Sequence, residues 1–261
     1  MHRVIVPVDF SETSLNAARY TAQMLAGKDN ALAVLYHNYE SHDDHDVSLN
    51  YQESLKKEFL KAGVKAVQTE SEMGGDLIEN ISRLAHTIRA SLIVMGITGK
   101  SAIRAAMFGS NTLKLIDRNL YPVMIIPPDA KYKGIKNVAF ASDFKNVEES
   151  TPAVLLDSVL DLFKPQLHIF HVNKDISVSE SAEVVGQKAL FEQMFKKYDT
   201  RFHFLIKNDF YSAVDSFIKD YEIDVMITIP KHQSNSMSLF KTTHTKRLAY
   251  HSHIPILAAH E

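Results

Sequence analysis

A glycine-rich segment after a short apolar run has the spacing with the clearest chemical meaning. It reads Gly96-x2-Gly99-x9-Gly109-Ser110, and a helical pattern follows at once. Glycines let the backbone leave a strand in conformations that a side chain would forbid, and they allow close approach to a ligand. Free N–H groups at a helix start favour an anion, and Ser110 could cap that helix or donate to a phosphate. The segment therefore predicts a phosphate-binding loop.

A surface loop followed by a serine-capped helix is the structural alternative for this segment. The chain has nine glycines, and three of them lie in this window, which favours phosphate binding. Lys100 and Arg104 add positive charge beside the glycines. The other common phosphate-loop spacings, G-x4-G-K-S/T and G-x-G-x-x-G, do not occur in the sequence.

Asp9 and the segment 41–46 are two further candidates. Asp9 ends the first apolar run and could contact a ligand, but an Asp between a strand and a helix is often a turn or cap residue. Asp143 has the same place in the second half, so both roles stay open. The segment 41–46 contains metal-ligand residue types, yet we interpret it as an exposed loop without a metal site. No serine, histidine and carboxylate pattern predicts a catalytic residue.

Four apolar segments recur in the same order in the two halves of the chain. The pairs are residues 4–10 and 138–144, 32–37 and 167–171, 92–96 and 225–228, and 121–126 and 254–258. A long helical pattern follows the first segment of each half. A polar segment bounded by proline and glycine, residues 127–134, joins the halves. The repeat predicts two domains, residues 1–129 and residues 135–261.

Within each half, short β-branched runs alternate with amphipathic stretches of helix length. In the first half we expect strands near 3–8, 31–37, 65–70, 92–96 and 122–126, and helices near 12–26, 48–62, 76–89 and 110–119. Apolar strands separated by helices indicate a parallel sheet that is covered on both faces. Each half is therefore predicted to be a five-stranded, mostly parallel, doubly wound α/β unit. Such sheets bind ligands at the carboxyl ends of their strands, where the strand order reverses.

The second half does not keep the glycine spacing. Phe240 aligns with Phe108, and this register places three larger residues where the first half has glycines, namely Thr228, Lys231 and Lys241. Each adds a side chain where backbone would have to approach a phosphate. We therefore expect the second half not to bind a nucleotide in the same manner. Binding of another anion by Lys231, His232, Lys241 and Thr242 stays an alternative.

The composition is that of an ordinary globular chain, with 45% hydrophobic and 23% charged residues. The lack of cysteine excludes disulfides and thiolate metal sites. A formal net charge of -2 does not favour nucleic acid or an anionic membrane as a partner. Neither a secretory signal nor an apolar run of membrane-spanning length is evident, so we expect a cytoplasmic location.

The glycine spacing resembles the signature of the ATP-binding members of the universal stress protein family. Residues 6–11, Val-Pro-Val-Asp-Phe-Ser, are similar to the first strand of that family, as are the strand that ends at His37 and the closing strand 122–126. The resemblance covers both halves. It implies two tandem units of the adenine nucleotide alpha hydrolase-like fold. It also implies that the first unit binds ATP, ADP or AMP, with any Mg²⁺ held by phosphate oxygens.

The resemblance also implies where the nucleotide lies. Asp9 would be near the ribose or adenine, and the backbone at His37 and Asn38 near the adenine. The phosphate side would be formed by Gly96, Gly99, Lys100, Gly109, Ser110 and Asn111. Two residues depart from the family pattern, because Asn38 stands where an aliphatic residue is usual and Asn111 where a small or apolar one is common.

The function implied is that of a nucleotide-binding regulator or stress-response protein without catalysis. ATP would order the loop 97–109 and alter a surface that a protein partner reads. The second half would act as a built-in pairing partner, and two chains could also associate as a homodimer. A slow ATPase or phosphotransfer enzyme that uses the same site is one alternative. A structural interaction protein without a physiological nucleotide is the other.

Overall fold

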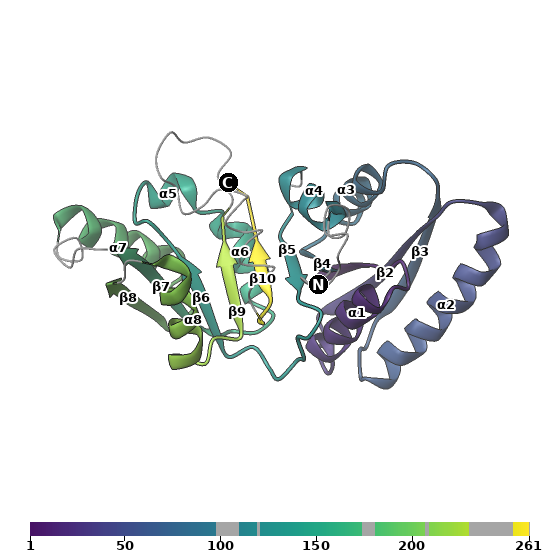
Figure 1. Cartoon of the computed structure of the whole chain (residues 1–261), viewed down its shortest axis with the longest axis horizontal. Coiled ribbons are helices and arrows are strands. Elements are labelled where there is room, and N and C mark those ends of the chain that lie inside the picture. The colour runs from purple at the N-terminus through teal and green to yellow at the C-terminus, as the bar shows by residue number, and fades with distance from the viewer. Residues whose placement is uncertain (98–109, 119–120, 174–180, 207–208, 230–252, 261) are drawn as a thin grey trace. The chain divides into compact units, whose positions relative to one another are not determined.

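The computed structural model describes residues 1–97, 110–118, 121–173, 181–206, 209–229 and 253–260. The chain divides into two compact units, residues 1–132 and residues 133–261 (Figure 1). Each unit is built on a parallel β-sheet flanked by helices, as the alternation of apolar runs and amphipathic stretches predicts. The predicted α/β fold class is confirmed.

The first unit contains a five-stranded sheet in the order β3-β2-β1-β4-β5, with every neighbouring pair parallel. Helices α1 and α2 lie on one face of this sheet, and α3 and α4 lie on the other (Figure 1). The elements are β1 (His2–Pro7), α1 (Glu12–Leu25), β2 (Ala31–Tyr39), α2 (His42–Lys61), β3 (Val67–Met73), α3 (Leu77–Ile88), β4 (Leu92–Gly96), α4 (Ser110–Arg118) and β5 (Val123–Ile126).

The second unit has the corresponding strand order, β8-β7-β6-β9-β10, and its neighbouring strands are also parallel. Its elements are β6 (Asn137–Ala141), α5 (Val147–Ser150), α6 (Ala153–Leu160), β7 (Gln166–Asn173), α7 (Ala182–Met194), β8 (Thr200–Ile206), α8 (Phe210–Asp220), β9 (Val225–Thr228) and β10 (Ile256–Ala258). In both units the first strand is central, so the strand order reverses between the first and the fourth strand.

The core of each unit follows directly from strand composition. Residues 4–6 of β1 read Val-Ile-Val and are fully buried, because helices cover both faces of a parallel sheet. β3, in contrast, reads Val-Gln-Thr-Glu-Ser-Glu-Met and is largely exposed at the end of the strand order. Charged side chains on such an edge strand discourage pairing with another chain.

Two local predictions were wrong. The segment 41–46 is not a loop, because α2 begins at His42, six residues earlier than predicted. A polar segment can form either a loop or a solvated first helical turn, and its composition alone does not distinguish the two. The long helix expected after Phe144 is broken into α5 and α6 at Pro152, which has no N–H to donate within a helix.

Within the described part of the chain, no group of three or more His, Cys, Asp or Glu residues is arranged to hold a metal ion. The helices described there are also too short or too polar to cross a membrane.

Candidate functional site

A cavity of about 670 Å³ opens in the first unit at the carboxyl ends of β1 and β2, where helices α1 and α2 form its other walls. Aromatic rings line one side of it. The Phe10 ring centroid lies 4.7 Å from that of His37 and 5.1 Å from that of Tyr51. These distances are typical of aromatic packing. The cavity therefore offers flat apolar surface suited to a planar ring.

The charged groups that line the cavity are mainly acidic. Asp9, Glu40 and Glu58 contribute carboxylates, and Arg19 is the one cation among the lining residues in the described part of the chain. Arg19 Nε donates to Glu58 Oε2 at 3.2 Å, which joins α1 to α2. The cavity thus presents more hydrogen-bond acceptors than donors. An anionic group would be repelled by this lining, whereas a ligand with N–H or O–H groups would be accepted.

Asp9 has a structural role at the start of α1. Its Oδ1 accepts hydrogen bonds from Ser11 N at 3.0 Å and from Ser11 Oγ at 2.6 Å. Ser11 in turn caps α1, because its Oγ accepts from Ser14 N. Burial raises the pKa of Asp9, but the hydrogen bonds from Ser11 and Ser14 outweigh burial and leave the pKa below its usual value. The carboxylate is therefore ionised at neutral pH, and it holds the turn that shapes the cavity.

His37 joins the end of β2 to the end of β1. Its Nδ1 lies 2.7 Å from Val8 O, and a carbonyl oxygen can only accept, so Nδ1 carries the proton. Nε2 of neutral His37 is therefore an acceptor. His171 makes the equivalent contact in the second unit, with Nδ1 2.9 Å from Ser142 O. A histidine at the end of the second strand is thus a structural tie in both units.

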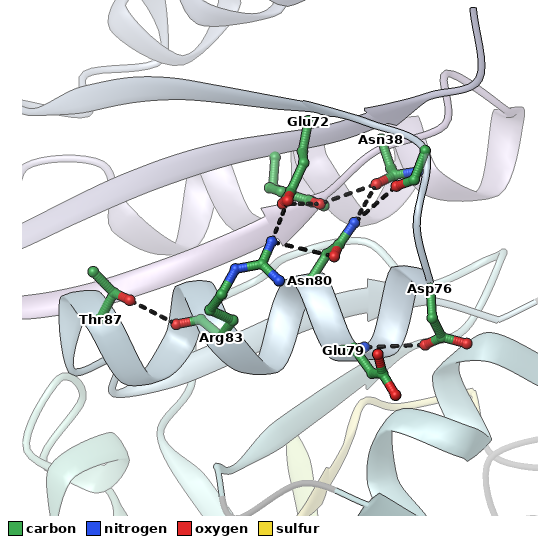
Figure 2. A network of polar contacts seen from close by, with 9 residues as sticks. Asn38, Glu72, Asp76, Glu79, Asn80, Arg83 and Thr87 are labelled. Carbon is green, nitrogen blue, oxygen red and sulfur yellow. Dashed lines mark hydrogen bonds and ion pairs between the residues drawn. The ribbon is translucent and has the colours of Figure 1, made fainter.

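Asn38 lines the cavity, but its side-chain oxygen is directed to α3 on the other face of the sheet (Figure 2). Asn38 Oδ1 accepts from Asn80 Nδ2 at 2.9 Å and from the Tyr36 hydroxyl at 3.2 Å. The departure from an aliphatic residue at this position therefore has a structural explanation. The polar side chain serves the contact between β2 and α3, where an aliphatic one would leave Asn80 without this acceptor.

Gly96 ends β4 next to the start of α1. A Cβ added at Gly96 would lie 2.5 Å from Thr13 O, so only glycine allows this approach. Gly96 is not in the left-handed region, so the sequence-based explanation by an unusual backbone conformation was wrong at this residue. Thr112 Oγ1 donates to Gly96 O at 2.9 Å and ties the first turn of α4 to the end of β4.

Of the remaining predicted phosphate-side residues, Asn111 is exposed in the first turn of α4. Gly99, Lys100, Gly109 and the side chain of Ser110 lie outside the described residues. The structure therefore brings together Asp9, Asn38 and Gly96 at one edge of the sheet, where the strand order reverses between β1 and β4. That edge is where a doubly wound sheet binds its ligand.

The second unit has a filled core at the position that corresponds to Phe10. Phe144 has the same left-handed backbone, with φ 54° against 59° for Phe10, but its side chain is 1% exposed. Its ring packs against Phe191 at 5.6 Å and Phe204 at 5.2 Å. Gln187 Oε1 accepts from Val147 N and fixes α7 against α5. Thr228 is buried at the end of β9. Lys231, His232 and Lys241 lie outside the described residues.

The α2 wall of the cavity has no local signal in the sequence. Tyr51 lies nine residues after the start of α2 and, in the sequence, is one residue of an amphipathic helical pattern. Phe10 belongs to the first repeated segment, and its sequence context predicts no role in ligand binding. Phe10 and Tyr51 are 41 positions apart in the sequence, so their contact depends on how α2 packs on the sheet. The left-handed backbone of Phe10 does not distinguish it either, because Phe144 has the same conformation and is buried in a core.

Residues 1–127 match the model of the universal stress protein family. The whole chain is similar in fold to a universal stress protein from Archaeoglobus fulgidus DSM 4304, with a TM-score of 0.72 at 16% identity, over 99% of this chain and 98% of that one. It is also similar to the cytoplasmic domain of a prokaryotic cation chloride cotransporter, with a TM-score of 0.59 at 10% identity, over 98% and 94% of the two chains.

A universal stress protein in complex with cAMP matches 49% of this chain and 97% of its own, at 24% identity and a TM-score of 0.41. No curated protein sequence matches the chain. The family match falls on the unit that contains the cavity and the glycine spacing. The likeness to the Archaeoglobus structure extends the shared fold through the second unit. By the match of residues 1–127, the first unit of this chain is a domain of the universal stress protein family.

Proposed function

We propose that the first unit binds one adenine nucleotide and that the protein acts as a nucleotide-dependent regulator without catalysis. The observation that carries this proposal is the cavity of about 670 Å³ at the carboxyl ends of β1 and β2. Gly96 ends β4, the strand that pairs with β1 on its other side, so it lies at the same end of the sheet. Its volume is in the range of small-molecule and cofactor sites. ATP, ADP and AMP share the base and ribose that such a cavity would take.

The lining of the cavity supports a base and ribose in it, with the phosphates elsewhere. Phe10 and Tyr51 provide rings for stacking, and His37 Nε2 and the Asp9 carboxylate can accept from an exocyclic amine or a ribose hydroxyl. The carboxylates would repel phosphates. Phosphates would instead lie at the glycine loop, where Lys100 and the first turn of α4 offer positive charge and N–H groups. Mg²⁺, where present, would be held chiefly by phosphate oxygens.

The second unit is proposed not to bind a nucleotide in this way. The support is the Phe144 side chain, which is buried among Phe191 and Phe204 at the position that corresponds to Phe10. The three replaced glycines add to it. We therefore expect one nucleotide per chain. A structural role for this unit, as a pairing partner for the first, stays a prediction from the sequence.

Regulation requires two states of the glycine loop with different affinities for the nucleotide, because a ligand shifts an equilibrium only by its differential affinity. In this proposal, nucleotide binding selects one state of the segment 97–109, and a protein partner reads that state. Asp9 has a low pKa and is engaged with Ser11, so it is not a free general base. This supports binding without turnover.

The proposal is tested by thermal shift and calorimetry with ATP, ADP, AMP and cAMP. We expect saturable stabilisation by at least one adenine nucleotide. The double variant Gly99→Val/Gly109→Lys should abolish the response. Gly186→Ala is the matched control, since it also replaces a glycine with a larger residue but lies on α7, with no atom within 4 Å of the added Cβ. It should respond like the wild type.

An unchanged nucleotide response in the glycine-loop double variant would show that the site is misassigned. Phosphate release measured over hours separates the regulator from the slow ATPase. Steady release that the double variant lacks would contradict the non-catalytic part of the proposal.

A further inference from the structure

A polar network in the first unit connects the cavity wall to α3 (Figure 2). Asn80 is at its centre, on the second turn of α3, and is 5% exposed. Its Nδ2 donates to Gly74 O at 2.9 Å and to Asn38 Oδ1 at 2.9 Å. Its Oδ1 accepts from Arg83, which also forms an ion pair with Glu72. The network therefore links the ends of β2 and β3 to one helix.

The partners determine how the two amides are oriented. Gly74 O can only accept, so the Asn80 atom facing it is Nδ2, and this nitrogen requires an acceptor on Asn38. The Tyr36 hydroxyl lies 3.2 Å from the same Asn38 oxygen and 3.3 Å from Glu72 Oε2, so these two acceptors share its one proton. Burial, reinforced by the Glu72 carboxylate, raises the pKa of Tyr36, so this hydroxyl stays protonated and can donate. Asn38 is thus held from two sides through its Oδ1.

Asn38 forms part of the cavity wall, whereas Asn80 does not. Asn38 and its neighbours His37 and Tyr39 line the cavity, and Asn80 contacts Asn38 from the opposite face of the sheet. Gly75 has a left-handed backbone, and a Cβ there would lie 3.1 Å from Asn80 Nδ2, so the turn before α3 is also fitted around this side chain. Asn80 therefore reaches the cavity wall through the end of β2, by Asn38 and by Gly74, whose N–H donates to Tyr39 O at 2.8 Å.

We propose that Asn80 is a positioning residue for the nucleotide site. It holds Asn38 and, with it, the end of β2 that forms one wall of the cavity. The inference rests on the proposed function for the identity of the ligand. That Asn80 holds the end of β2 in place is a separate claim, which does not require a ligand. It assigns to α3 a role in binding, although α3 lies on the face of the sheet opposite to the cavity.

A double-mutant cycle tests the inference in the full-length chain, with ADP or ATP as the titrated ligand and Kd as the readout. Asn80→Ala and Asn38→Ala should each raise Kd by about tenfold, as for residues within one network. The double variant should show the same rise of about tenfold, because both substitutions remove one shared effect. A general structural weakening would instead multiply the two effects to roughly one hundredfold.

Thr87→Ala is the matched control, since Thr87 is exposed on the same helix and donates only to Arg83 O in the contacts described. It should leave Kd unchanged. Binding is measured well below the unfolding midpoint of each variant, so that all chains are folded. An Asn80→Ala variant with wild-type Kd, or effects that multiply in the double variant, would overturn the proposal.

Amide hydrogen exchange without ligand provides the second readout. Asn80→Ala should speed exchange at residues 38–40 but not at β5, and Thr87→Ala should do neither. If the wild type binds no nucleotide, the proposed function is wrong, and the exchange data still decide whether Asn80 holds this wall. Unchanged exchange at residues 38–40 would show that it does not.

Discussion

A side chain at position 96 would collide with the start of α1. The added Cβ would meet Thr13 O at 2.5 Å and Thr13 C at 2.9 Å, and both are backbone atoms. Neither can move without shifting α1 or β4 as a whole. The glycine therefore has a packing role at the edge of the site, in addition to any role toward a phosphate. The same reasoning applies to Asp9, which is engaged in the turn before α1 whether or not a ligand is bound.

We expect Gly96→Ala to lower the free energy of unfolding of the first unit by about 1–3 kcal/mol, the cost of overpacking a close contact. Chemical denaturation checks this. Gly186→Ala should instead be neutral or stabilising by roughly 0.5–1 kcal/mol, because its Cβ meets no atom and alanine favours a helix. A fully stable Gly96→Ala variant would contradict the packing role.

At the level of elements, β7 and β8 are joined by a pair of histidines. His168 Nδ1 lies 3.1 Å from His203 Nε2, and the rings are stacked. Tyr221 and Phe217 cover His203, at 4.4 Å and 5.0 Å. His168 Nε2 is buried without a hydrogen-bond partner among the described residues. Two neutral imidazoles fit this contact, because one of the two nitrogens must donate and the other must accept. Protonation of the accepting nitrogen would leave two N–H groups facing each other.

This pair predicts acid sensitivity of the second unit. Burial lowers the pKa of His168, and burial with nearby His168 and Arg201 lowers the pKa of His203 to about 4. An unfolded histidine has a pKa of about 6.5, so below that pH the unfolded chain binds more protons than the folded one. Stability contributed by the neutral pair is therefore full above pH ~6.5 and is lost as the pH falls toward 4.

The expected loss at pH 4 is about 2–3 kcal/mol for His203, after allowance for its partial exposure. Denaturation curves of the second unit between pH 7 and pH 4 measure it. His203→Phe, which keeps an aromatic ring, should flatten this pH dependence. The exposed His86→Gln on α3 is the control and should not. A slope that survives His203→Phe would assign the acid sensitivity to other groups.

At the scale of the whole molecule, the two units have the same strand order but differ in the surroundings of the phenylalanine after the first strand, which is Phe10 in one and Phe144 in the other. Phe10 faces a cavity, and Phe144 is buried in a core of aromatic rings. Both units keep a left-handed phenylalanine after the first strand, and both keep the histidine contact at the end of the second strand. The shared features therefore belong to the fold, and the cavity belongs to the first unit.

We expect nucleotide to stabilise the first unit selectively, with about one nucleotide bound per chain. At one hundred times Kd, the free energy of opening measured by hydrogen exchange should rise by about 2.7 kcal/mol for β1 amides. Amides of β6 should change much less. Two equivalent sites per chain, or equal protection of both sheets, would contradict the assignment of the site to the first unit.

Local patterns in the sequence were sufficient for the existence and type of the elements of the first unit, but not for every boundary. The Val-Ile-Val run of β1 and the amphipathic face of α3 are each encoded within a few neighbouring residues, and the structure confirms them. The start of α2 was missed because a polar segment can be a loop or a solvated first turn. The broken helix at Pro152 was missed because the apolar pattern on either side continues.

The sequence by itself therefore determined the parallel α/β fold, through the alternation of apolar runs and amphipathic stretches. It also determined the family resemblance, through the spacing of its glycines. The role of Asn38, the contact of Phe10 with Tyr51 and the burial of Phe144 were decided only in the tertiary structure. Each of these depends on residues from different elements, such as Asn38 of β2 and Asn80 of α3. Their meeting is set by how helices pack on the two faces of the sheet, and no local spacing in the chain specifies that packing.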